Sequence, residues 1–398
     1  MSRQWLKKEG PKWVKDGVIT EGQYHVLLKR YPRKRYKSLL PLFASILIAL
    51  GILSFVAANW QQIHELVRVS IIITAMAAFY WIGFRQYEKG NDRAGAGLAG
   101  IGVASFGAGI FLIGQMFHFV SFTASPFILW AIAGLGAAAL IPSRFLLILP
   151  MLISIAGQVY IFGNFNSFSY ILAAIFLLGA GHFVYHRASI ETSAVFGLGY
   201  AVTGLLFVIA ELESGLWMPV LLALLYFLGA VSGKNNVYWP FRWVSLFGGV
   251  VFSLFMVFSG GIAEELSQPV LLAVFFSAAA AVLFLIVSRT DKANLTDILL
   301  FLPWFYIGEA ADVFYVILLL IYSILSLLIG YKEERIEKIN FGTVVFLVST
   351  LAAYIHLAWD FMPKSLFFLV GGVLLFALSW YLEKRRRAAG GSGGGHDE

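Results

Sequence analysis

The side chains best able to do chemistry in this sequence lie near the ends of its hydrophobic segments. Ionisable groups are costly inside a bilayer and usually have a function there. Arg68 is the strongest candidate, because it lies about one helical turn into a hydrophobic segment and needs an acidic partner or an anionic ligand. We predict an outward-facing polar ligand site made of six residues: Arg68, Trp60, Gln115, His118, Gln158 and Asp360.

A structural alternative explains the same residues without a ligand. Arg68 would extend its guanidinium to the membrane surface, and the amides and histidines would cap helix ends or bridge neighbouring helices. Other polar residues, including Asp312 and His356, fall at the same predicted outer ends. The sequence leaves both interpretations open.

Fragments of catalytic motifs are present, but none has the context that its chemistry requires. Gly95 to Gly100 matches the dinucleotide pattern G-x-G-x-x-G, yet it opens a hydrophobic segment without a preceding strand and favours helix packing instead. His64-Glu65 begins a zinc-protease pattern, but Arg68 occupies the place of the second histidine. The sequence has no cysteine, which excludes thiolate metal sites and cysteine nucleophiles. We therefore predict no catalytic residues, no metal and no cofactor.

Composition excludes a soluble globular protein. Of 398 residues, 60% are hydrophobic and 13% are charged, and the mean hydropathy is +0.81, whereas soluble domains carry about 25% charged residues. The net charge of +7 comes from the first 37 residues, which have an excess of eight cationic side chains. Cations gathered at one end fit membrane topology rather than a nucleic-acid surface, so we expect no nucleic-acid partner.

Window length predicts an all-α integral membrane protein with a bundle of about fourteen transmembrane helices. The predicted segments are 38–59, 66–85, 94–117, 124–142, 145–163, 168–186, 191–211, 215–232, 241–260, 268–288, 295–308, 311–331, 340–358 and 365–383. With a cytoplasmic N-terminus, 27 of the 29 lysines and arginines fall inside, as the positive-inside rule requires. Both termini are then cytoplasmic. The weakest segment is 295–308, which is short and contains Asp297 and Pro303.

The N-terminal residues predict a short cytoplasmic helical hairpin. Thr20 and Gln23 form a capping box, whereas Gly10-Pro11 opens an earlier helix that Asp16-Gly17 ends. A basic set follows that would attract anionic lipid headgroups by about 1 kcal/mol per residue, unless it is a topology signal alone. It consists of Lys29, Arg30, Arg33, Lys34, Arg35 and Lys37. The predicted domains are the hairpin at 1–37, the transmembrane domain at 38–383 and a basic, then Gly-rich flexible tail at 384–398.

Several short motifs occur in a recognisable order along the chain. They are Asp16-Gly17-Val18-Ile19-Thr20, Ala57-Ala58-Asn59-Trp60, Gly114-Gln115-Met116-Phe117-His118, Asn340-Phe341-Gly342, Gly371-Gly372 and Glu383-Lys384-Arg385. With these motifs most of the chain resembles the bacterial family of polytopic membrane proteins catalogued as domain of unknown function 2157. The resemblance implies a protein of the bacterial inner membrane and carries no established activity or site residues.

Three functions are compatible with the sequence. A transporter or flippase-like protein for a lipid-linked or amphipathic small molecule is favoured, because many spans with Gly-rich helices and small loops suit a mostly apolar path. An envelope scaffold or sensor is the second, with the hairpin as its partner-binding element, and a membrane-embedded lipid-modifying enzyme with an outward-facing polar site is the third. Expected partners are membrane lipids, with anionic headgroups at the cytoplasmic face. A homo-oligomer or a further membrane partner is left open.

Overall fold

The computed structural model describes residues 3–30, 63–117, 123–212, 214–231, 236–259, 278 and 294–358, with a few residues between 369 and 380. These residues are helical or in turns, and the described part contains no strand. The chain divides into two compact units, Met1–Arg68 and Val69–Glu398. The predicted division at residues 37 and 383 stays a prediction.

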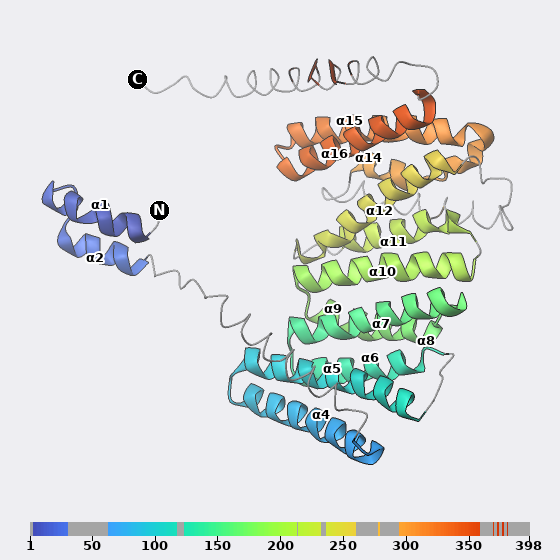
Figure 1. Cartoon of the computed structure of the whole chain (residues 1–398). Helices are drawn as coiled ribbons and strands as arrows, with labels where there is room; N and C mark the ends of the chain where they lie inside the picture. Colours follow the sequence, from blue (N-terminus) through green and yellow to red (C-terminus); the bar gives the residue numbers. More distant parts are fainter. Residues whose placement is uncertain are drawn as a thin grey trace. The chain divides into compact units, whose positions relative to one another are not determined.

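The first unit contains the predicted helical hairpin, formed by α1 (Arg3–Lys15) and α2 (Glu21–Arg30) (Figure 1). Its capping box is confirmed, because the Thr20 amide donates to Gln23 Oε1 at 2.9 Å and the Gln23 amide donates to Thr20 Oγ1 at 3.3 Å. Gly17 turns the chain between the helices with φ of +73°, a conformation that glycine adopts without strain.

The predicted start of the first helix at Gly10-Pro11 is wrong, because α1 already begins at Arg3 and contains Pro11. Gly10 has a packing role instead: a side chain there would overlap the Tyr24 ring of α2. Of the predicted basic set, Lys29 and Arg30 end α2, and residues 33–37 lie outside the described residues.

The rest of the described chain is a succession of helices. In chain order these are α4 (Glu65–Glu88), α5 (Asp92–Met116), α6 (Ser125–Leu140), α7 (Arg144–Phe165), α8 (Tyr170–Ala174), the π-helix η2 (Ile175–Ala180), α9 (Gly181–His186), α10 (Ile190–Ala210), η3 (Gly215–Trp217), α11 (Met218–Val231), η4 (Asn236–Tyr238), α12 (Trp239–Phe258), α14 (Leu295–Ile298), η6 (Leu299–Phe301), η7 (Trp304–Ala310), α15 (Ala311–Lys332), α16 (Ile336–Ala353) and the π-helix η8 (Tyr354–Ala358).

Within the second unit, helices close in sequence are mostly neighbours in space (Figure 1). α6 packs on α7, α7 on α10, α10 on α12, α12 on α11 and α15, and α15 on α16. The largest buried core lies among α11, α12 and α15. Large apolar side chains on the outside, such as Leu178 and Phe247, are 74% and 63% exposed, as expected of surfaces that a bilayer would cover.

Among the described residues, seven helices are long and apolar enough to cross a membrane, and three apolar stretches are shorter. The seven are α4, α5, α7, α10, α12, α15 and Ile336–His356. The ten together coincide with ten of the predicted hydrophobic segments. Segments 38–59 and 268–288 lie almost wholly outside the described residues, as does most of 365–383. Segment 295–308 is broken into α14, η6 and η7, interrupted at Leu302 and Pro303.

The Gly-rich pattern of α5 packs helices, as the sequence indicated. A methyl group on Gly95 would come within 2.8 Å of the Tyr87 amide nitrogen and 2.9 Å of the Gly83 carbonyl oxygen of α4. Further along α5, Gly102 receives the Tyr80 ring and Gly107 receives the Trp130 ring. Glycine therefore lets the α4 and α5 backbones touch, a contact that does not depend on the hydrophobic effect.

We expect Gly95→Ala to lower the melting temperature of the purified protein in detergent, because the new methyl group meets rigid backbone and costs about 1–3 kcal/mol. The matched control is Gly97→Ala in the same helix, where the methyl group would meet nothing within 4 Å. Equal melting temperatures for the two variants would contradict a glycine-mediated contact.

Candidate functional site at the ends of α12 and α16

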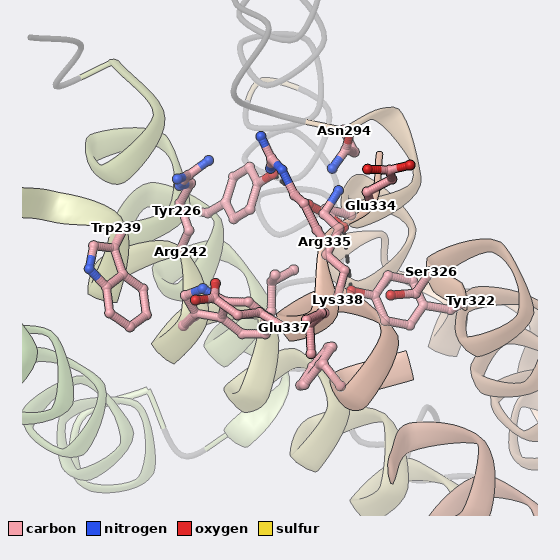
Figure 2. A pocket seen from close by; sticks show the side chains of 15 residues that line it. Tyr226, Trp239, Arg242, Asn294, Tyr322, Ser326, Glu334, Arg335, Glu337 and Lys338 are labelled. Atoms are coloured by element: carbon pink, nitrogen blue, oxygen red, sulfur yellow. Dashed lines mark hydrogen bonds between the residues drawn. The ribbon is translucent and has the colours of Figure 1, made fainter. Parts of the chain in front are cut away.

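A pocket of about 790 Å³ lies where five helical elements of the second unit meet, α11, α12, α14, α15 and α16 (Figure 2). Most of its lining side chains are charged, polar or aromatic, which is unusual in so apolar a chain. The lining residues are Tyr226, Trp239, Arg242, Trp243, Leu246, Asn294, Asp297, Tyr322, Ser326, Glu334, Arg335, Ile336, Glu337, Lys338 and Phe341.

Asp297 is the buried acidic group of this pocket, with 7% of its surface exposed. The Tyr226 hydroxyl donates to its Oδ2 at 2.7 Å, and the Tyr322 hydroxyl donates to its Oδ1 at 3.3 Å. A buried carboxylate is tolerated only when it is hydrogen-bonded or paired. The two tyrosines meet this requirement and tie α14 to α11 and α15.

Three cationic side chains lie around the same pocket. Arg242 comes from the first turn of α12, Arg335 precedes α16, and Lys338 lies in the first turn of α16. Arg242 and Lys338 are close enough to Asp297 to interact with it electrostatically. Glu333, which does not line the pocket, forms an ion pair with Arg335 and another with Lys338. Its Oε2 lies 3.5 Å from both Arg335 Nε and Lys338 Nζ.

Two long helices begin at the pocket wall. The residues that precede α12 and α16, Tyr238 and Arg335, make no side-chain capping bond to their helix. The first-turn amides of such helices carry partial positive charge and favour anions. Glu334, in the turn before α16, has φ of +55°, a left-handed conformation that is uncommon for glutamate and recurs at functional sites.

The sequence did not identify this site. In the sequence, Asp297 was considered only as a residue that weakens the prediction that segment 295–308 spans the membrane. A lone carboxylate in an apolar segment is nevertheless by default a functional candidate. Its tyrosine partners lie 71 and 25 residues away, so no spacing rule reveals them.

The structure describes three residues of the predicted outward site: Arg68, Gln115 and Gln158. Arg68, in the first unit, donates from Nε to the Ile63 carbonyl oxygen at 2.6 Å. Gln115 is exposed at the end of α5. Trp60, His118 and Asp360 lie outside the described residues. A shared ligand site among the six residues stays a prediction.

Gln158 is buried and hydrogen-bonded to the backbone of Ser169. Its side chain is 1% exposed, its Nε2 donates to the Ser169 carbonyl oxygen at 2.7 Å, and its Oε1 accepts from the Ser169 amide at 3.1 Å. Ser169 itself caps α8 by accepting from the Leu172 amide. Gln158 therefore fixes the connection between α7 and α8.

His356 and Asp312 form a polar pair at the end of the α15–α16 hairpin that is far from the pocket. The His356 Nε2 lies 2.8 Å from Asp312 Oδ2, and both side chains are about one-fifth exposed. The π-helix η8 carries His356, and the first turn of α15 carries Asp312. The sequence placed both at predicted outer ends without pairing them.

Comparison with known proteins gives a family match in the N-terminal third. Residues 11–147 match the family model "Predicted membrane protein (DUF2157)". This confirms the resemblance for the part of the chain that contains the motifs at 16–20, 57–60 and 114–118, and the motifs from residue 340 on lie outside the matched range. No curated protein and no solved structure matches the chain. With its candidate spans, the chain is a predicted multi-pass membrane protein, and the DUF2157 match does not extend to the pocket residues.

We expect Gln158→Leu to destabilise the protein by about 1–3 kcal/mol, because the Ser169 amide loses its partner, whereas the Ser169 carbonyl still accepts from the Ala173 amide at 3.0 Å. Gln115→Leu, the same change at an exposed position, should leave the melting temperature nearly unchanged. If Gln158→Leu lowers the melting temperature no more than Gln115→Leu does, the contact with Ser169 does not stabilise the protein.

Proposed function

We propose that this protein binds the anionic headgroup of an amphipathic molecule in the pocket between α12 and α16, as a step in moving that molecule across the membrane. The observation that supports this is the convergence of Arg242, Arg335 and Lys338 on one cavity at the starts of two helices. Guanidinium groups, an ammonium group and helix N-termini are the protein groups that bind phosphate and carboxylate. A transporter or flippase-like function would use all of them.

The size and lining of the pocket fit a headgroup. Small-molecule sites occupy about 300–1,000 Å³, and this one has about 790 Å³. Trp239, Trp243 and Phe341 supply apolar wall beside the charged groups. A molecule with a charged end and an apolar end could satisfy both kinds of surface.

The pocket would lie at the cytoplasmic surface in the proposed topology. About half of its lining residues lie in or beside loops that the positive-inside rule assigns to the cytoplasm: Trp239, Arg242, Asn294 and Glu334 to Lys338. In this topology about fourteen helices span a bacterial inner membrane, both termini are cytoplasmic, and the N-terminal hairpin and its basic set face anionic lipid headgroups. The outward set that includes Arg68, Gln115 and Asp360 would then serve the opposite side of the path.

We expect Arg242→Gln to weaken binding of a phosphate-bearing lysolipid about tenfold or more, because a hydrogen bond to a charged group contributes about 1.5–3 kcal/mol. Binding would be followed by native mass spectrometry of the full chain. The control is Arg144→Gln, which removes an exposed arginine that pairs with Glu191 at 3.2 Å. Equal loss in the two variants would reject the pocket as the site.

Transport of the ligand is tested by a measurement separate from binding. In liposomes containing the full chain, a fluorescent phospholipid should become accessible to an external quencher faster than in protein-free liposomes, and Arg242→Gln should slow this exchange. Tight binding without any exchange would leave the pocket as a binding site and reject transport.

Sidedness can be tested because the chain has no cysteine. We expect Thr123→Cys to react with an impermeant maleimide in intact cells, and Lys89→Cys and Lys332→Cys to react only after permeabilisation. Labelling of Lys332→Cys in intact cells would place the pocket on the outer side and overturn the topology.

A further inference from the structure

The pocket contains acidic groups as well as cations, and this mixture restricts its ligand. Resting on the proposed function, we infer that the bound headgroup is zwitterionic, with an acidic phosphate and a primary ammonium, and that Asp297 receives the ammonium. Asp297 would then determine specificity, and the cations would hold the phosphate.

The first argument is charge balance. The ionisable side chains of opposite sign in the lining are equal in number, with Arg242, Arg335 and Lys338 against Asp297, Glu334 and Glu337. Glu333, outside the lining, also pairs with Arg335 and Lys338 at 3.5 Å. A purely anionic headgroup would bring its charge close to three carboxylates. A headgroup that carries both signs can pair with both sets.

The second argument is the fixed position of Asp297. At 7% exposure this carboxylate has little access to solvent, and a tyrosine hydroxyl holds each of its oxygens. A carboxylate has about four acceptor positions, so the two tyrosines leave capacity for further donors. A primary ammonium has three donors and suits an acceptor that is already oriented.

The third argument is the aromatic wall beside this carboxylate. The Trp243 and Phe341 rings meet edge to face with centroids 5.1 Å apart, and the Tyr322 and Phe341 centroids are 6.5 Å apart. α12, α15 and α16 thus supply aromatic surface next to the acidic group. Aromatic faces attract ammonium groups and add affinity when water is excluded.

The test compares two lysolipids with the same acyl chain, lysophosphatidylethanolamine and lysophosphatidylglycerol, on the full chain purified in detergent. Both carry a phosphate, but only the first carries an ammonium. We expect the wild-type protein to bind the ethanolamine lipid about tenfold more tightly, and Asp297→Asn to abolish the preference by weakening that lipid alone.

The matched control is Asp312→Asn, which makes the same change at a hydrogen-bonded carboxylate at the other end of α15 and should keep the preference. Equal affinity of the wild-type protein for both lipids, or equal weakening of both by Asp297→Asn, would overturn the inference. If Asp297→Asn does not fold, the wild-type preference alone decides.

Failure of this inference differs from failure of the proposed function. If both lipids bind equally and Arg242→Gln weakens both, the headgroup site stands and only the ammonium assignment falls. If neither lipid binds, both proposals fall unless the free headgroups bind. Binding of O-phosphoethanolamine and glycerol 3-phosphate, which have no acyl chain, shows whether the headgroup comes from a lipid or from a soluble compound. A preference for O-phosphoethanolamine would support a zwitterionic ligand and indicate that this ligand is soluble.

Discussion

The fold follows from one constraint: inside a bilayer no water is available to pair with backbone N–H and C=O groups. Long helices satisfy these groups within themselves, and α5, α7, α10, α12 and α15 do so over 20 residues or more. Because lipid tails are as apolar as leucine, helix association then depends on close contact and on polar bonds. The glycines between α4 and α5 provide the first, and the tyrosines around Asp297 provide the second.

The polar groups of interest gather where regular α-helix is interrupted. Asp297 lies in a four-residue helix that continues into 3₁₀ turns, and His356 lies in a π-helix after α16. Each interruption leaves the backbone less regular, and π-helices recur at functional positions. The α15–α16 hairpin thus has a charged pocket at its turn and a histidine–aspartate pair at its open end.

Sequence patterns predicted the parts of this structure that depend on local order. Hydropathy located ten apolar helices to within a few residues, and the spacing of Thr20 and Gln23 gave a correct capping box. Contacts between distant residues were beyond such patterns. Gln158 was proposed as a ligand group because it lies in the outer half of its hydrophobic segment, whereas its bonds to Ser169, 11 residues on, could not be read from spacing. The Asp297 pocket exists only once five helical elements are packed together, so its site residues were missed.

Two glycines bring α15 and α16 close together near the turn of their hairpin. A methyl group on Gly342 of α16 would come within 3.1 Å of the Leu327 amide nitrogen of α15, and one on Gly330 of α15 would come within 3.0 Å of the Ile339 amide nitrogen of α16. Both contacts lie near the turn that carries Arg335, far from His356. The two glycines therefore set the spacing of α15 and α16 close to the pocket. A side chain at either glycine would push the two helices apart beside Arg335, so the wall of the pocket depends on two residues that do not line it.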